Sequence, residues 1–431
     1  MITAAYRLVE TLAVNGVTHV FCVPGESYLA VLDAFVDFQD RIQVITCRHE
    51  AGAANMAVAY AKLTGRPGIC FVTRGPGATH ASIGVHTASQ DSAPLILFVG
   101  QVARSDRGRE GFQEIDYTAM FGSMTKLAVE VSDPTRIVEI TTRAFATAMQ
   151  GRQGPVVVAL PEDMLSENAG DRTPRAMQPA QATLDPAVAL TIAARLEKSA
   201  RPLMILGGTG WNDAALARLA SWAEQIELPI ALSWRRKDLL DNNHPCYAGD
   251  LSIRPSAGLN ERIKAADLVI AIGSRLGDIP TLGYQMFSAE EAATKLIHIH
   301  PAAQDLNRVW QVSLSAIASE AHAALALSEL IIKRRWKEWR QAARTDYERS
   351  IEPVTSVGNV NLSQIFTFLA QVLPPDAILA NGAGNYAAWP NRFYRYRNPR
   401  TQLAPTSGAM GFGFPAGIAA KIVHPERDVI A

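Results

Sequence analysis

The sequence predicts an α/β fold made of three doubly wound parallel-sheet units. Short apolar runs rich in Val, Ile and Phe, among them QVITC, GICFVT and PLILFVG, recur between helical patterns. These runs do not alternate apolar with polar residues, which is typical of strands buried on both faces of a helix-covered parallel sheet. The 431 residues are too many for one ordinary core, so we expect two or three domains of about 100–200 residues each.

The first unit is expected over residues 1–165. A helix at about residues 3–14 precedes the strand HVFCVP, and a second helix follows at about residues 28–38. The strand QVITC then leads into a helix of small residues, AGAANMAVAYAKLTG, and the strand GPVVVALP ends the unit. The polar segment 166–184 carries Pro and Gly, so we expect a linker there.

Two further units follow. The second is expected over residues 185–330, with strands at PLMILGG, PIALS, DLVIAIG and KLIHIH. The basic stretch 331–352 is expected to be a linker helix whose solvated face covers a domain junction. The third unit, residues 353–431, contains the strand AILANGAG and ends on the buried-type strand RDVIA. It amounts to about half of a doubly wound domain, so we expect this unit to be incomplete.

Composition gives no reason to expect nucleic acid or a membrane as the partner. Lysine plus arginine equals aspartate plus glutamate, 41 against 41, so no net field attracts an anionic polymer. The arginine-aromatic segment 392–400 is therefore expected to be a surface loop. The N-terminus lacks the features of a signal peptide, and no window approaches about 18 charge-free apolar residues. The four cysteines form no CxxC pair, which favours a reducing, cytoplasmic location.

Three segments carry the pattern of a ligand site. Glu50, in RHEAGAANMA, stands where a strand gives way to a helix, and open α/β sheets bind ligands at such strand ends. The alternative for Glu50 is a helix-start residue interacting with the helix dipole. TRGPGATHA, residues 73–81, is a strand-to-helix turn that offers backbone N–H groups. SGAMGFGFPAGIAA, residues 407–420, surrounds Met410 with small residues; the alternative is a tightly packed helix start with methionine as filler.

Together with PGESYLAVLDA at 24–34 and GREGFQEID at 108–116, these segments resemble, in the same order, the thiamine-diphosphate-dependent family of acetolactate synthases, 2-oxoacid decarboxylases and related carboligases. The resemblance extends over nearly the whole chain. It implies a pyrimidine-binding domain, a central domain and the first part of a diphosphate-binding domain. It also implies decarboxylation of a pyruvate-like 2-oxo acid with carboligation to a second carbonyl compound. A non-ligating decarboxylase and a non-catalytic binding or assembly protein that keeps the fold are the alternatives.

The resemblance implies roles for individual residues. Glu50 matches the glutamate that hydrogen-bonds N1′ of the aminopyrimidine and favours the imino form, which takes the C2 proton. Met410 matches the apolar wedge beneath the bent cofactor, the carbonyl of Gly408 is expected to accept from the 4′-amino group, and Gln113 faces the reacting centre. The other implied cofactor-binding residues are Pro24, Gly25, Glu26, Thr73, Gly75, Gly384 and Asn385. Because the family glutamate acts on a cofactor held by a second subunit, a homodimer or a tetramer is implied.

Several departures from the family pattern concern metal and subclass. The family's Gly-Asp-Gly motif normally follows a strand like RDVIA, so ligands for Mg²⁺ are expected beyond Ala431. The 431-residue chain is accordingly expected to bind the cofactor weakly and to turn over poorly. Ile279 stands where synthases carry a second arginine, and Glu26 stands where they carry a small residue. Gln113-Glu114 replaces the paired histidines of decarboxylases, and on balance a carboligase is favoured.

Two other features bear on further cofactors. The glycine run LGGTGW, residues 206–211, follows a strand but lacks a full GxGxxG. Some relatives bind FAD or ADP there and others bind nothing, so both possibilities stay open. His298 and His300 share one face of a strand without further ligands, so we expect no metal there.

Overall fold

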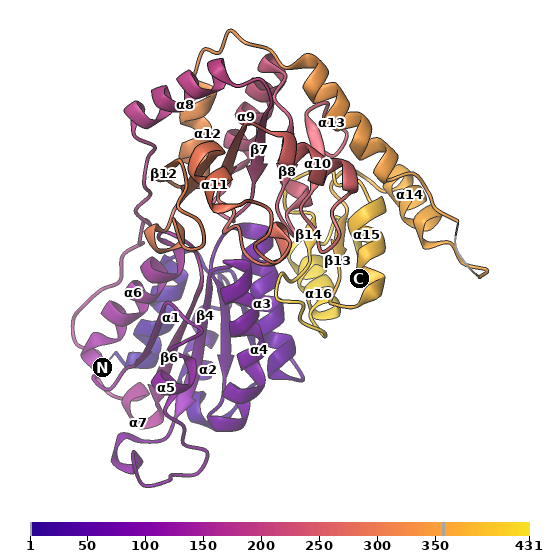
Figure 1. Cartoon of the computed structure of the whole chain (residues 1–431). Helices are drawn as coiled ribbons and strands as arrows, with labels where there is room; N and C mark the ends of the chain where they lie inside the picture. The colour runs from indigo at the N-terminus through magenta and orange to yellow at the C-terminus, as the bar shows by residue number, and fades with distance from the viewer. Residues whose placement is uncertain (1, 356–357) are drawn as a thin grey trace.

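The computed structural model describes residues 2–355 and 358–431. Its strands form two six-stranded sheets and one three-stranded sheet. All pairings between the named strands are parallel, which confirms the predicted α/β fold (Figure 1). The boundaries given above for the three units remain a proposal.

The first sheet has the order β2-β1-β3-β4-β6-β5. Its strands are β1 (His19–Cys22), β2 (Gln43–Thr46), β3 (Gly68–Val72), β4 (Leu95–Gln101), β5 (Leu127–Glu130) and β6 (Pro155–Pro161). The chain passes from β1 to β2 on one side and to β3 on the other, so a topological switch point lies between β1 and β3. Ligands bind open parallel sheets at the carboxyl ends of the strands beside such a point.

Helices cover both faces of the first sheet. The central strand β3 is apolar throughout because alternate residues face opposite layers: Cys70 and Val72 pack in one cluster, while Ile69 and Phe71 pack in the other. The edge strand β2 differs from the expectation, because its residues are half-buried or exposed. One layer contains α3 (Glu50–Thr64) and α4 (Gly75–Asp91). The opposite layer contains α1 (Ala4–Val14), α2 (Leu29–Val36) and α6 (Ile137–Met149). The short helices α5 (Tyr117–Phe121) and α7 (Glu162–Leu165) complete this part of the chain.

The second sheet has the order β12-β11-β10-β7-β8-β9, with its switch point between β7 and β10. Its strands are β7 (Pro202–Leu206), β8 (Ile230–Leu232), β9 (Tyr247–Asp250), β10 (Leu268–Ile272), β11 (Leu296–His300) and β12 (Leu314–Ile317). The helices of this part are α8 (Pro186–Lys198), α9 (Asp213–Ile226), α10 (Ala257–Ala265), α11 (Ala289–Lys295), α12 (Glu320–Ser328) and α13 (Lys337–Ser350). The predicted linker helix therefore begins at Lys337, not at residue 331.

The third sheet is small, with the order β14-β13-β15. Its strands are β13 (Ile378–Ala380), β14 (Gln402–Leu403) and β15 (Val429–Ile430), and its helices are α14 (Leu362–Val372), α15 (Ala388–Phe393) and α16 (Gly413–Val423). Helix α16 shares an apolar cluster with α3 and lies beside it in Figure 1. Over residues 2–355 and 358–431, no helix combines the length and the apolar character needed to cross a membrane.

Candidate functional site

The switch point of the first sheet brings several of the predicted residues together. Pro24–Glu26 follow β1, Glu50 opens α3 just after β2, and Thr73 follows β3. A Cβ atom on Gly25 would lie only 2.6 Å from Cβ of Thr73. Glycine is therefore required at residue 25, because the turns after β1 and β3 pack directly against each other. The Ser27 and Thr73 hydroxyls join the same two turns at 2.8 Å.

Glu50 is held between two helices. Its side chain is 13% exposed, and its Oε2 lies 2.9 Å from Nδ1 of His80 on α4. Its Oε1 is 3.6 Å from the position that a Cβ on Gly77 would take. The His49 ring, which caps α3, stacks on the His80 ring with centroids 4.6 Å apart. A carboxylate at a helix N-terminus is favoured by the helix dipole, so the dipole reading of Glu50 and the site reading are compatible.

The ligand atoms of His49, Glu50 and His80 lie within 4.8 Å of one another, close enough to hold a metal ion. His49 Nδ1, however, already accepts from the Ala51 N–H at 3.1 Å, and His80 Nδ1 faces the glutamate. Hydrogen bonding and helix capping thus explain the cluster without a metal.

Gln113 lies over the turn that follows β3. Its carbonyl oxygen accepts from the Gly75 N–H at 3.0 Å, and a Cβ on Gly75 would lie 2.8 Å from that oxygen. Gln113 has φ of 66°, in the left-handed region that side chains rarely adopt. Beside this turn, Glu26 accepts from Arg74 Nη2 at 3.2 Å while remaining largely exposed. The 108–116 loop therefore closes over the residue 73–75 turn.

Gly408 and Met410 form a second group, just before α16. Gly408 has φ of 69°, which suits glycine, and the Met410 side chain is 81% exposed. This segment is anchored by a buried ion pair in which Lys62 Nζ lies 2.5 Å from Asp91 Oδ2. Lys62 also donates to the carbonyl of Ala404 at 2.7 Å, and the Thr406 N–H donates to Asp91 Oδ1 at 2.6 Å.

The Lys62–Asp91 ion pair lies at the opposite end of helices α3 and α4 from Glu50. Asp91 ends α4, whereas His80 lies in its second turn. At 1.5 Å of rise per residue, the eleven intervening steps amount to roughly 16 Å. The structure thus gathers Glu50, Thr73 and Gln113 at one end, and it fixes the approach to Met410 at the other.

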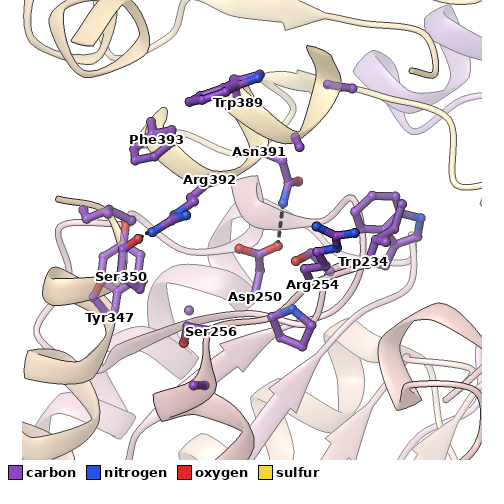
Figure 2. Close-up of a pocket in the computed structure, with 18 of the residues that line it drawn as sticks. Trp234, Asp250, Arg254, Ser256, Tyr347, Ser350, Trp389, Asn391, Arg392 and Phe393 are labelled. Carbon is purple, nitrogen blue, oxygen red and sulfur yellow. Dashed lines mark hydrogen bonds between the residues drawn. The ribbon is translucent and has the colours of Figure 1, made fainter. Parts of the chain in front are cut away.

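Gly384 and Asn385 form a third group and line a cavity of about 960 Å³ (Figure 2). The cavity lies between the carboxyl ends of β8 and β9, the end of α13 and the segment that includes α15. Asp250 and Asn391 face each other across it, with Asn391 Nδ2 donating to Asp250 Oδ2 at 3.0 Å. Burial raises the pKa of the Asp250 carboxyl above its ordinary value. The lining residues all come from 234 to 393, so the Glu50 group contributes none of them.

The glycine turn after β7 is filled by the chain itself. The Glu320 carboxyl, at the start of α12, is buried in it and accepts from the Thr209 N–H at 3.3 Å. A Cβ on Gly208, Gly210 or Gly273 would collide with the Glu320 side chain. The missing side chains of this turn therefore make room for Glu320.

His298 and His300 behave as core histidines. His298 Nε2 lies 2.8 Å from the carbonyl of Ser274, and His300 Nδ1 lies 3.2 Å from that of Ala302. Both rings are buried, and burial lowers both pKa values. Each ring therefore has a backbone partner.

Four residues were missed from the sequence: His80, which contacts Glu50, and three residues that line the cavity, Arg235, Asp250 and Asn391. His80 lies inside the segment TRGPGATHA, so the helical spacing after Gly75 could have pointed to it. Arg235 follows the strand PIALS at a carboxyl end, the edge where ligands bind. Asp250 and Asn391 are 141 residues apart, and no local pattern joins them.

Family comparisons assign all three parts of the chain to one group of proteins. Residues 2–120 match "Thiamine pyrophosphate enzyme, N-terminal TPP binding domain". Residues 190–329 match the central domain of the same enzymes, and residues 382–431 match their C-terminal TPP binding domain.

Individual relatives agree with this assignment. An acetolactate synthase large subunit of Parasynechococcus marenigrum is 31% identical over 444 residues, which cover 100% of this chain and 71% of the relative. An acetolactate synthase of Mycobacterium bovis is 30% identical, with 100% and 71% covered. A probable acetolactate synthase large subunit of Methanocaldococcus jannaschii is 29% identical, with 99% and 74% covered.

Proposed function

This chain belongs to the thiamine pyrophosphate enzyme family, and we propose that it decarboxylates a pyruvate-like 2-oxo acid and transfers the remaining unit to a second carbonyl compound, as an acetolactate synthase does. The observation that carries the proposal is the placement of Glu50. Its carboxylate is mostly shielded from water and lies at the switch point of the first sheet, among the turns that the family resemblance assigns to the cofactor. The relatives favour carboligation over simple decarboxylation.

The residues around Glu50 fit a pyrimidine ring. Within the described residues, Glu50 Oε1 makes no hydrogen bond, whereas Oε2 is held by His80. One carboxylate oxygen is thus free for N1′ of the ring, and the absence of a side chain at Gly77 leaves space beside it. Bound thiamine diphosphate supplies the carbon nucleophile and the electron sink for loss of carbon dioxide. Glu50 would hold the proton shared with the ring, and Gln113 would face the reacting centre.

We propose that the working unit is a homodimer or a larger assembly. Met410 is exposed, and its segment is anchored at the end of α4 remote from Glu50. A second copy that presents Met410, Gly408, Gly384 and Asn385 to Glu50 would complete the site. Magnesium, the usual partner of a bound diphosphate, is proposed as a second cofactor.

Subunit mixing tests the shared site. Subunits with Glu50→Gln and subunits with Met410→Asp would each be inactive alone. Mixed in equal amounts, they should regain roughly a quarter of the sites, because half of the dimers are mixed and each of these has one intact site. If the mixture stays inactive although the subunits have exchanged, then Glu50 and Met410 of the same chain belong to one site, and the shared-site proposal is wrong.

The catalytic proposal is tested with the full-length natural protein, pyruvate, thiamine diphosphate and magnesium, by measuring acetolactate and acetaldehyde. Acetolactate should be the main product. Glu50→Gln should lower kcat by about 10²–10⁴-fold, the usual contribution of a positioned proton-transfer group. Glu329→Gln, a change at an exposed carboxylate remote from the site, is the matched control. Acetaldehyde as the sole product, or an unchanged rate in Glu50→Gln, would contradict the proposal.

We also propose that the glycine turn after β7 holds neither FAD nor ADP. The buried Glu320 carboxyl supports this, because it takes the backbone N–H that a phosphate would need.

A further inference from the structure

Arg235 is a buried cation that forms no ion pair within the described residues. It follows β8, lines the cavity of Figure 2 and is 4% exposed. Its Nε and Nη1 atoms have no hydrogen-bond partner among the described residues. The guanidinium stacks on the Trp234 ring, with Cζ 4.3 Å from the ring centre. Burying an unpaired charge is expensive, so this arrangement points to an anion that is brought by a ligand.

The neighbouring groups do not supply that anion. Two acids, Asp91 and Asp250, act on Arg235 electrostatically, yet no ion pair joins either to it in the described part of the chain. Asp91 is paired with Lys62, and the Asp250 carboxyl accepts from Asn391. Burial raises the pKa of Asp250, which favours its neutral form. Asp346 is engaged by Arg262 at 2.7 Å.

Further positive charge surrounds the cavity. Arg254, Arg349 and Arg392 also line it, and Arg392 Nε donates to the carbonyl of Ser350 at 2.7 Å (Figure 2). Lys237, fully buried beside it, donates to the carbonyls of Asn391 at 2.5 Å and Tyr394 at 3.1 Å. The cavity is therefore rich in cations and poor in accessible carboxylates.

The free donors of Arg235 suit an oxyanion. Nε and Nη1 lie on different edges of the planar guanidinium, because Nη1 is on the side of Cδ, and each can donate a charge-assisted hydrogen bond to an anionic oxygen. The backbone of Arg235 has φ of 59°, in the left-handed region. Such strain in a non-glycine residue is retained where the surrounding structure holds a side chain in place for function.

We propose that Arg235 binds an oxyanion in this cavity, namely the carboxylate of the 2-oxo acid substrate. The identity of the acid rests on the function proposed above; the anion site rests on the cavity. The diphosphate of the cofactor is the other source of the same chemistry, because Gly384 and Asn385 line the same space.

The test measures binding rather than turnover, with the full chain and no thiamine diphosphate present. Pyruvate and inorganic pyrophosphate are titrated by calorimetry into the wild type, Arg235→Gln and Arg235→Lys. Arg235→Gln should weaken pyruvate binding by about tenfold or more, the usual effect of losing a charge-assisted hydrogen bond. The pyruvate affinity of Arg235→Lys should lie between those of the wild type and Arg235→Gln, because lysine keeps the charge but lacks the planar guanidinium. Pyrophosphate affinity should change by less than about twofold in both. Arg218→Gln, at an exposed arginine on α9, should behave as the wild type.

A measurement of Tm distinguishes a loss of pyruvate binding from a loss of the folded structure. Without ligand, Arg235→Met should keep the Tm of the wild type or raise it by about 2 °C or more, because it removes an uncompensated buried charge. A clearly lower Tm would show a structural partner for Arg235 and would overturn the proposal.

Two binding results would also overturn it. One is pyruvate affinity that does not depend on Arg235, including no binding to the wild type. The other is a selective loss of pyrophosphate affinity in the Arg235 variants, which would mean that Arg235 binds the diphosphate of the cofactor. The outcome is separable from the proposed function, because a protein that binds pyruvate through Arg235 yet makes no acetolactate refutes only the function.

Discussion

His80 Nδ1 on α4 lies 2.9 Å from Oε2 of Glu50, so α4 holds the carboxylate that begins the preceding helix, α3. The His49 ring stacks on His80 and limits its rotation. If Glu50 acts on the cofactor as proposed, His80 is a positioning residue that leaves Oε1 as the reactive oxygen.

Replacing His80 by alanine should lower kcat by roughly 10-fold to 100-fold, because a hydrogen bond to a charged group contributes about 1.5–3 kcal/mol. The Tm should change little, since the His80 side chain is 52% exposed. Steady-state kinetics at saturating thiamine diphosphate, with thermal unfolding, measure both. His86→Ala, at an exposed position on the same helix, is the control. An equal loss of kcat in both variants would show a general effect on α4.

The Lys62–Asp91 pair should be a strong determinant of stability. Burial lowers the pKa of Lys62. For Asp91, burial acts to raise the pKa, but Lys62 and Thr406 outweigh it and lower the pKa. Lys62→Met leaves the Asp91 charge buried without its partner, which costs about 3–5 kcal/mol.

Urea unfolding measures the loss of stability in Lys62→Met, which breaks the buried pair. It is compared with Lys264→Met, which breaks an exposed ion pair. Lys264→Met should have little effect. The double variant Lys62→Met/Asp91→Asn should recover part of the loss, because no unpaired charge remains. A small effect of Lys62→Met would mean that water reaches Asp91 in solution.

In the two large sheets, the sequence predicted the central strands and the edge strand β2 but not the edge strands β5, β9 and β12. β3 and β4 are apolar runs buried on both faces, which is a local signal. β5 and β12 are short edge strands of half-buried or alternating residues, so their sequence resembles a loop. The predicted helix over 331–336 was wrong: Ile331 is 88% exposed, and the Trp336 indole donates to the carbonyl of Ser199. In this segment, the contacts with the rest of the fold hold an irregular chain, although the apolar and basic residues resemble the start of a helix.

The candidate site divides in the same way. Short contiguous motifs contain Glu50, Thr73 and Gln113, and the strands before these motifs could be recognised from the sequence. The places of the three residues in the fold could therefore be predicted, while their roles remain predictions. The pairing of Glu50 with His80 needed the packing of α3 on α4. Arg235, Asp250 and Asn391 meet only because the second and third sheets pack together, and nothing local in the sequence encodes that contact.

Glu320 should make stability depend on pH. Burial raises its pKa above the ordinary value of 4.5. Its contribution is therefore present below about pH 4.5, where folded and unfolded chains are both protonated, and is lost as pH rises through the folded pKa. Glu320→Gln does not ionise, so its stability relative to the wild type should increase with pH, by up to about 1.4 kcal/mol per pH unit. Urea unfolding from pH 5 to 8, with Glu329→Gln as the control, measures this difference. A difference that does not change with pH would mean that Glu320 is ionised when folded.

The filled glycine turn also predicts how the protein responds to dinucleotides. FAD incubated with the wild type and then dialysed should leave no flavin absorbance, and ADP should show no heat of binding. Glu320→Ala removes the carboxyl that collides with any side chain at Gly208 or Gly273, and it frees the Thr209 N–H. That N–H faces the carboxyl end of β7, where parallel sheets bind phosphate, so weak ADP binding should emerge in the variant. Stoichiometric flavin in the purified wild type would mean that Glu320 leaves the turn when a ligand arrives, and the assignment of this turn would then have to be reversed.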